Sequence, residues 1–506
     1  MKAIKNIMIA LSGIALLASC DMDKFFELDR PESNPWLSVD DLEYSVADPY
    51  NTLFQNPNWQ APIGIIPYYQ ELVADLSTVN PQGAYEQEAL YWYPRQMSTF
   101  DVTGQQFEKT FSILYRSVTG ATSPLTYIEE KEKKGEPVFA NMTENDKKTL
   151  ARQTGELYFM RGYTYWLISR AFVAPYDPAG GEGNNRKFIP LINRLDYSQE
   201  SARNPYMGTV KEVYDQMLSD FAKAKSLMPE DYFVRGRANK FSAAMMLMRV
   251  KWLMGDKDGA LEEADYVITK AEAGVAPFDL TEEPIVAFNR NAEQQYTVDP
   301  VSKEVMFECA FTESNQGNNV AIPLARMCKT GIYNFKSKTF DASNKLWLEG
   351  ARGSQNWQHG GWACAYWNPR LIKYIGWAVT DDPMDLTNYV PSAEALADKR
   401  FTQLHYFLKN YTDGGDKTIH EMAYNKTKWN AFWNDKYYRA PYGKYSQVPL
   451  IRLAEAYLTR ATLVLSKNAS QALGDVNKIR QRAGLTPLKN VTEADIEKER
   501  IKEFGF

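Results

Sequence analysis

The sequence predicts a mostly α-helical protein, an α-α superhelix of helix pairs interrupted by a long loop-rich insertion that carries short strands. Three observations lead to this fold class. Apolar residues recur at helical spacing on both sides of the insertion, and a Gly-Asp turn joins two of these helices. The stretch over 273–445 is instead rich in Gly, Asn, Pro and Trp and has little helical periodicity. Stretches of this kind are commonly functional in compact proteins.

Composition limits the classes of protein to consider. Of the 506 residues, 44% are apolar and 24% are charged, the balance of a globular protein large enough for two or three domains. Lys and Arg number 58 against 63 Asp and Glu, so the net charge is −5 and no nucleic-acid partner is expected. The chain has only 3 His and 4 Cys, and we expect neither a metal site nor a cofactor. Cys309, Cys328 and Cys364 lack any C-x-x-C spacing and are expected to be buried free thiols.

The first twenty residues have the pattern of a secretory signal followed by a lipid-attachment cysteine. A charged start precedes an apolar run from Ile7 to Leu17, which is too short to span a bilayer core. Leu17-Ala18-Ser19-Cys20 resembles a bacterial lipobox, in which the cysteine thiol receives a diacylglyceryl group. We therefore expect a signal peptide over 1–19 and a lipidated Cys20 that begins an acidic tether over 20–35. The alternative is an ordinary signal with an incidental cysteine.

Two long helices are predicted before residue 230. The first runs from about Asp146 to Phe172, and Gly155, Gly162 and Ser169 recur along it every seven residues. Each glycine costs about 0.5–1 kcal/mol of helix stability, so this spacing predicts a neighbouring helix that needs the room. The second helix begins near Thr209 and is stopped by Pro229. Its apolar face is formed by Val210, Val213, Tyr214, Met217, Phe221, Ala224 and Met228.

A helix pair follows directly. The helix from about Asn239 to Met254 is apolar nearly all round, as a central buried helix would be. After the turn at Gly255-Asp256, an amphipathic helix runs from Ala260 to Ala271. The pair resembles the second half of a tetratricopeptide repeat. Asp256-x-Asp258-Gly259 also has a superficial likeness to a calcium loop, but it lacks the further ligands and is better interpreted as a helix N-cap.

Helical periodicity returns after the insertion. Leu450 to Leu465 carries one helical face, Ala472 to Ile479 forms its partner, and Thr492 to Glu503 begins with a Thr-x-x-Asp capping pattern. Within the insertion, a short strand is expected at Glu304 to Phe311. Two bare aromatics end the chain in Phe504-Gly505-Phe506, from which we expect a truncated sequence.

Several motifs, in this order, resemble the SusD/RagB-like outer-membrane lipoproteins. The segment from Gly155 to Trp166 is similar to the family's E-x-x-F-L-R-A-x-x-Y helix, and Val213 to Ala224 to its V-Y-x-x-I-x-x-D-L-x-x-A helix. The most specific match is Pro449 to Leu458, followed by Val476 to Leu485 and by Glu499-Arg500 with Glu503-Phe504. On this resemblance, 36–272 is an N-terminal SusD-like helical repeat region, 273–445 a loop-rich ligand or interface region, and 446–506 the C-terminal SusD/RagB helical region.

The resemblance also implies a function. Proteins of this family are cell-surface lipoproteins that bind oligo- or polysaccharides and deliver them to a SusC-like TonB-dependent transporter. In such lipoproteins, acidic residues soon after the cysteine, here Asp21 and Asp23, accompany export to the outer face of the outer membrane. The expected partners are therefore the transporter, the glycan and the membrane that holds the lipid anchor.

The candidate glycan contacts are aromatic residues outside the helix cores. Sugars present flat C–H faces and a rim of hydroxyls, so their sites pair an aromatic platform with polar side chains. Two stretches have this composition, one around Trp92 and one from Trp347 to Trp377, and we expect them to form opposite walls of one cleft. The candidates are Asp75, Tyr91, Trp92, Tyr93, Arg95, Trp357, His359, Trp362, Tyr366, Trp367 and Asn368. The alternative is that these aromatics fill small cores under long loops or face a protein partner.

Enzymatic interpretations find little support in the sequence. It contains no G-x-S-x-G elbow, P-loop or H-E-x-x-H motif, and His359 with Cys364 is a single weak spacing for a catalytic dyad or metal pair. Glu455, Arg480 and Arg482 are expected to be structural, so no catalytic residue is predicted. The alternative function is a tetratricopeptide-type scaffold that binds peptide or protein ligands at the outer membrane, and a divergent glycosidase is a third class.

Overall fold

The computed structural model describes residues 36–54, 62–79, 105–196, 198–288, 302–309, 333–334, 339–340, 348–351, 365–382, 384–385, 387–412, 429–434, 436 and 448–505. The predicted signal, Cys20 and the tether lie outside these residues. Among the described helices, none is both long and apolar enough to cross a membrane. The fold is mostly helical, as predicted, with short strands between two helical arrays.

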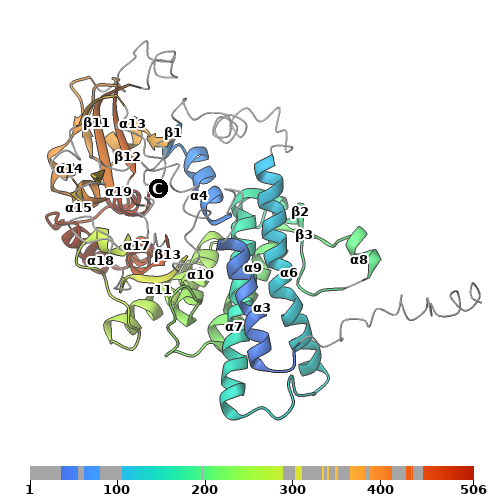
Figure 1. Cartoon of the computed structure of the whole chain (residues 1–506). Helices are drawn as coiled ribbons and strands as arrows, with labels where there is room; N and C mark the ends of the chain where they lie inside the picture. The colour runs from blue at the N-terminus through green and yellow to red at the C-terminus, as the bar shows by residue number, and fades with distance from the viewer. Residues whose placement is uncertain are drawn as a thin grey trace, which may run out of the picture.

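The first array consists of long helices from the N-terminal half of the chain. They are α3 (Val39–Phe54), α6 (Gln105–Lys133), α7 (Glu144–Phe172) and α9 (Val210–Leu227), with the shorter α4 (Pro62–Val73) beside α6 and α7. Successive members pack on one another, α3 on α6, α6 on α7 and α7 on α9. Figure 1 shows them side by side on the right of the molecule. The two predicted long helices, α7 and α9, are confirmed.

The glycines of α7 lie where α9 comes closest. A Cβ added at Gly155 would lie 2.7 Å from Cγ of Met228, the residue that caps the C-terminus of α9. A Cβ added at Gly162 would lie 3.0 Å from Cε1 of Phe221 in the middle of α9. The predicted need for room beside these glycines is therefore confirmed.

The second array continues the superhelix across the insertion. It comprises α10 (Lys240–Leu253), α11 (Lys257–Glu272), α17 (Leu453–Val464), α18 (Ala469–Arg482) and α19 (Glu493–Phe504). Here α10 packs on α9 and on α11, α11 packs on α17, and α17 packs on α18. Asp256 caps α11 by accepting a hydrogen bond from the Gly259 amide at 2.9 Å, which confirms the N-cap interpretation.

The helix predicted to begin at Leu450 begins three residues later in the structure. Val448–Arg452 forms strand β13, so Leu450 belongs to a strand and helix α17 starts only at Leu453. The reason is the partner strand β4 (Val305–Cys309), which pairs antiparallel with β13 and confirms the strand expected near Glu304. Apolar periodicity alone did not distinguish the last strand residues from the first helical turn.

Strand β4 joins the two arrays. All of its side chains are buried, including the free thiol of Cys309. Phe307 projects into the first array, where its ring centroid lies 5.1 Å from that of Phe159 and 5.5 Å from that of Tyr163, both on α7. Its partner strand β13 leads directly into α17 of the second array.

A buried network of charges surrounds the beginning of β4. Glu304 accepts from Arg452 at 2.8 Å and also pairs with Arg482, while Glu503 pairs with the same two arginines at 2.7 and 2.5 Å. All four side chains are less than a tenth exposed. We call these four residues the buried charge network. Arg480 pairs with Glu499 and Glu455 with Arg249, so the predicted structural role of Arg480, Arg482 and Glu455 is confirmed.

The insertion forms a third body of short elements, on the upper left of Figure 1. Strand β11 (His405–Thr412) pairs antiparallel with β12 (Trp429–Asn434) and parallel with β7 (Leu348–Ala351). The helices are α13 (Pro369–Tyr374), α14 (Ala393–Ala397) and α15 (Lys399–Leu404), and β9 (Ala378–Val379) pairs with β10 (Val390–Pro391).

The remaining short elements lie both before and within the insertion. They are η2 (Glu182–Asn185), β2 (Lys187–Pro190), α8 (Gln199–Arg203), β3 (Met207–Thr209), η3 (Pro284–Phe288), β5 (Tyr333–Asn334) and β6 (Thr339–Phe340).

The central position of α10 predicts a large cost for shortening Leu247, whose side chain is 4% exposed. Leu247→Ala should lower the free energy of unfolding by about 2–5 kcal/mol, because it leaves a cavity in the core. Lys257→Ala, at the exposed start of α11, should change it by less than about 0.5 kcal/mol. Urea denaturation of both variants measures the difference. Equal losses would contradict the position given to α10.

Candidate functional site

A small two-stranded sheet brings together two parts of the chain that are far apart in sequence. Strand β1 (Ser77–Val79) pairs antiparallel with β8 (Ala365–Trp367), with Ser77 opposite Trp367 and Val79 opposite Ala365. The stretch around Trp92 follows β1 in the chain, and β8 lies within the Trp-rich stretch from Trp347 to Trp377. The sheet therefore brings a segment that precedes the stretch around Trp92 into contact with the middle of the Trp-rich stretch.

Asn368 fixes the turn that leads into this sheet. Its Nδ2 donates to the carbonyl oxygen of Asp75 at 2.9 Å, across 293 positions of sequence, and its backbone amide donates to the carbonyl oxygen of Leu76 at 3.0 Å. Its Oδ1 accepts from the amide of Arg370 and so caps α13. Two candidate residues, Asp75 and Asn368, are thus in direct contact.

Asp75 occupies a strained backbone position at the end of α4. Its φ of 60° lies in the left-handed region, which non-glycine residues seldom adopt outside turns. The turn ends α4 and redirects the chain into β1, while the Asp75 side chain is exposed to solvent. Figure 1 shows α4 and β1 between the first array and the insertion body. A polar side chain is therefore presented at the edge of the sheet.

Tyr366 and Trp367 do not form an exposed platform. Both side chains are fully buried. The Tyr366 ring centroid lies 5.3 Å from that of Trp433, and the Trp367 centroid lies 5.6 Å from that of Trp377 and 5.3 Å from that of His405. The prediction of sugar contact is wrong for these two side chains in this structure, because they fill the core beneath the sheet.

Charged residues that the sequence analysis did not single out hold this aromatic core in place. Trp377 donates from Nε1 to Asp398 at 3.2 Å, and Asp398 binds Arg400 through two hydrogen bonds of 3.0 and 2.8 Å. Arg400 also pairs with Glu499 of α19 at 2.8 Å. Burial alone would raise the pKa of Glu499, yet Arg400 and the neighbouring cations hold it below its ordinary value. The core under β8 is therefore connected to the C-terminal helix.

The residue after α19 touches the same core. A Cβ added at Gly505 would lie 2.5 Å from Cη2 of Trp367, so only a glycine allows the chain to approach this ring so closely. The Nζ of Lys436 donates to the carbonyl oxygen of Gly505 at 2.5 Å and to that of Glu503 at 3.3 Å. Burial, together with the positive charge of Arg452, lowers the pKa of Lys436 to about 7. The local sequence around Lys436 does not predict these hydrogen bonds, because both acceptors lie at the end of α19, 67 and 69 positions away.

The other seven candidates lie outside the described residues. They are Tyr91, Trp92, Tyr93, Arg95, Trp357, His359 and Trp362. Their role in glycan contact stays a prediction, as does the proposed junction of the two walls beyond the β1–β8 sheet. His359 and Cys364, considered as a pair in the sequence analysis, are also outside the described part of the chain.

Two family models match the chain. One, described as starch-binding associating with outer membrane, matches residues 55–251, and the other, described as the SusD family, matches residues 303–506. The chain belongs to the SusD/RagB family. In this SusD/RagB protein the first match covers α4, α6, α7 and α9, and the second covers β4, β13 and helices α17 to α19.

The chain is similar to two SusD-like proteins and to a solved structure from other bacteria. SusD-like protein P2 from Formosa agariphila is 25% identical over 354 residues, which cover 68% of this chain and 59% of that protein. The starch-binding protein SusD from Bacteroides thetaiotaomicron is 43% identical over 60 residues, 12% of this chain and 11% of that protein. The chain thus aligns with less than two thirds of either relative's length. A putative sugar binding protein from Bacteroides vulgatus has a similar fold, with a TM-score of 0.62 and 18% identity over 93% of this chain and 84% of that one.

The depressed pKa of Lys436 predicts a specific pH dependence of stability. Between pH 7 and the ordinary lysine value of 10.5, the unfolded chain holds a proton that the folded chain does not. The free energy of unfolding should therefore rise with pH, by up to about 1.4 kcal/mol per pH unit from this residue. Lys436→Met should remove that contribution, because the methionine side chain does not bind a proton in either the folded or the unfolded chain.

Urea denaturation at about pH 7, 8 and 9 isolates this effect as the difference between the wild type and Lys436→Met. The control is Lys257→Met, at an exposed position, which should keep the wild-type slope. An unchanged slope in Lys436→Met would show that Lys436 is not the group that titrates.

Proposed function

We propose that this chain is a glycan-binding lipoprotein, which captures oligo- or polysaccharides at the outer membrane and delivers them to a SusC-like TonB-dependent transporter. The observation that carries the proposal is the match of two family models, over 55–251 and 303–506, to proteins described as starch-binding or as SusD family members. The relative from Bacteroides thetaiotaomicron is named for starch binding and supports a carbohydrate ligand.

The β1–β8 sheet supports the position of the glycan site. Trp362 lies three positions before Ala365 of β8 in the sequence. Tyr91 follows the end of the partner strand β1 by twelve positions of sequence. Both aromatic stretches are thus near the paired strands in sequence, and the Asp75 side chain, two positions before β1, is exposed to solvent. An aromatic platform with a carboxylate and amides at its edge has the donors, acceptors and apolar faces that a sugar ring requires.

Binding without chemical conversion fits the residues better than catalysis. Within the described part of the chain, the buried carboxylates of Glu304, Glu499 and Glu503 are each paired with an arginine in the core. A glycosidase needs two carboxyl groups that flank the scissile bond at about 5–9.5 Å. We therefore propose capture and transfer, with no catalytic residue.

Protein binding by the second array is a second candidate function. A pocket of about 530 Å³ opens between α9, α10 and α11, with Tyr266 at its side and Lys225 4.3 Å from the centre of that ring. Tetratricopeptide-like arrays commonly bind partners in such concave surfaces. If Tyr266→Ala weakens binding of a protein partner and leaves glycan binding unchanged, the result would favour protein binding as the function of this pocket.

The site proposal predicts that Trp92→Ala and Trp362→Ala each weaken glycan binding about ten-fold, the effect of about 1.4 kcal/mol. Melting temperatures should stay nearly unchanged, because a binding platform is exposed when it is empty. Affinity electrophoresis through gels that contain soluble starch or other purified polysaccharides selects the ligand, and calorimetric titration gives the Kd. The same incubations should release no new reducing ends.

Two variants calibrate this measurement. Tyr44→Ala, at a side chain that is 83% exposed on α3, should change neither quantity. Trp367→Ala, at a fully buried ring, should lower the melting temperature strongly. If Trp92→Ala and Trp362→Ala behave like Trp367→Ala and leave binding intact, these tryptophans belong to the core. If only association with the transporter is lost, they form its interface.

The anchor proposal predicts that Cys20→Ala abolishes acylation and releases the protein from the envelope, because the apolar run before it is too short to hold a membrane. Fractionation of cells that express the wild type or Cys20→Ala measures this release. Ser19→Ala, which keeps a small residue before the cysteine, is the matched control and should stay membrane-bound. Continued membrane fractionation of Cys20→Ala would contradict lipid anchoring.

A further inference from the structure

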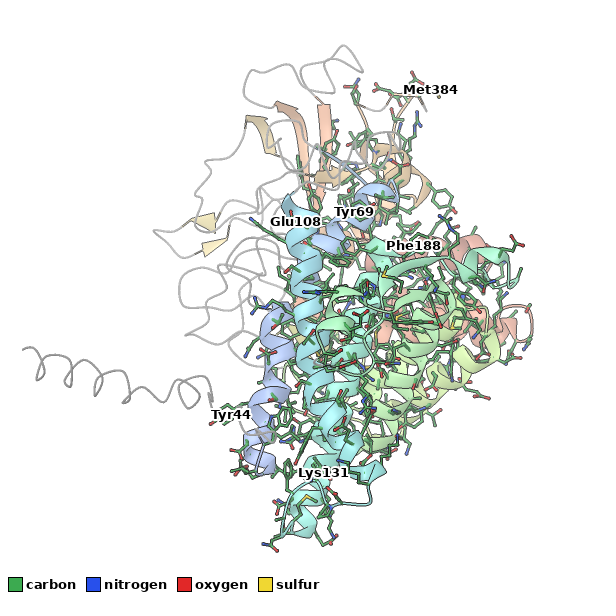
Figure 2. The ribbon with its side chains drawn as sticks, turned by 90° about the vertical axis from the view of Figure 1, so that its right-hand side faces the viewer. Tyr44, Tyr69, Glu108, Lys131, Phe188 and Met384 are labelled. Carbon is green, nitrogen blue, oxygen red and sulfur yellow. The ribbon has the colours of Figure 1, made fainter. Side chains whose placement is uncertain are left out.

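A second pocket lies between the first two long helices, α3 and α6. It has a volume of about 600 Å³ and is lined by one face of α3 and by the N-terminal half of α6. Figure 2 shows Glu108 at the upper end of α6, near Tyr69 of α4, and α4 packs against α6. The pocket begins about one helical turn below that end, at Phe111. Its volume is within the range that holds small ligands.

Two half-buried aromatic rings form the floor of this pocket. Phe111 and Tyr115 are one turn apart on α6, and their ring centroids lie 4.6 Å apart with the planes tilted by 38°. Phe111 packs edge-on against Phe172 at 5.2 Å, and the Tyr115 hydroxyl donates to the carbonyl oxygen of Pro190 at 2.6 Å. Both rings are therefore held in position before any ligand arrives, which reduces the entropy lost on binding.

Polar groups of both signs form the rim. Asp48 and Thr52 lie one turn apart on α3, and Arg116 and Thr119 lie on the facing side of α6. A Cβ added at Gly120 would lie 2.3 Å from Oδ2 of Asp48, so the glycine leaves room for the carboxylate at the pocket edge. Within the described part of the chain, Asp48 and Arg116 have no ion-pair partner, and both are exposed. Their hydrogen-bonding groups are available to a ligand.

We propose that this pocket binds one pyranose ring of a neutral glycan. The C–H face of the ring would stack on Phe111 and Tyr115, while its hydroxyls donate to Asp48 and accept from Arg116. One acid and one base give the rim no net charge, which favours a neutral sugar over an acidic one. The inference rests on the proposed function and adds to it a second contact on a rigid helical surface, through which one polysaccharide could bind at two points with higher avidity.

The test uses the full chain labelled at threonine methyl groups, because Thr52 and Thr119 report directly from the rim. Their resonances are assigned with Thr52→Ser and Thr119→Ser. The probes are methyl α-glucopyranoside, methyl β-galactopyranoside and methyl α-mannopyranoside, each titrated to about 50 mM, well above a Kd of about 1 mM. With at least one probe, both resonances should shift along a saturable curve.

Variants at the exposed rim then test the contacts without disturbing the core. Arg116→Ala and Asp48→Asn should each raise the Kd of that probe about ten-fold. Lys109→Ala, exposed two turns earlier on α6 and outside the pocket, should leave it unchanged. The absence of shifts at both methyl groups with all three probes would overturn the proposal, and so would equal Kd values in the wild type and Arg116→Ala.

Retention of the wild type in polysaccharide gels separates this proposal from the proposed function. Retention without methyl shifts would mean that the protein binds glycans but not in this pocket. Methyl shifts without retention would support the pocket and contradict polysaccharide capture by the protein.

Discussion

The structure depends on the ion pairs of the buried charge network, which join four chain segments at one point. Glu304 and Glu503 each bind both Arg452 and Arg482, and every one of these pairs is shielded from solvent. Removal of charges from water is costly, and a buried pair is stable only when its geometry is good and its remaining hydrogen bonds are satisfied. Loss of one partner leaves an uncompensated buried charge, which typically costs 3–5 kcal/mol. The network therefore specifies how β4, β13, α18 and α19 assemble.

The same point connects the helical arrays with the candidate site. Glu304 lies directly before β4, and Phe307 in that strand packs among the rings of α7. Glu503 lies two residues before Gly505, which packs against Trp367 under the β1–β8 sheet. One strand and one helix end thus fix both the contact between the arrays and the floor beneath the site.

The sequence predicted elements whose signals are local and missed those whose partners are distant. Helices α7, α9, α10 and α11 follow from apolar spacing and turn residues, and the glycines of α7 even indicated the close approach of another helix. Helices α3 and α6 were not predicted, and each contains a proline, Pro49 and Pro124, in its interior. Composition selected Tyr366 and Trp367 as exposed aromatics, but their burial depends on Trp433, His405 and Gly505, which no local pattern connects to them.

The hydrogen bond between Asn368 and Asp75 has a consequence for the order of folding. The first array forms between neighbouring helices, whereas the hydrogen bond beside the β1–β8 sheet joins Asn368 and Asp75, which are 293 positions apart. Closing a long loop costs more entropy than closing a short one, and long-range contacts form slowly. Nascent chains emerge N-terminus first, so the helices of the first array can pack while β8 and Gly505 are still to come. Strand β8 can pair with β1 only after residue 367 has been synthesised, and Trp367 in that strand is covered only when Gly505 has followed. The sheet next to Asp75 is therefore among the later parts of the described structure to form.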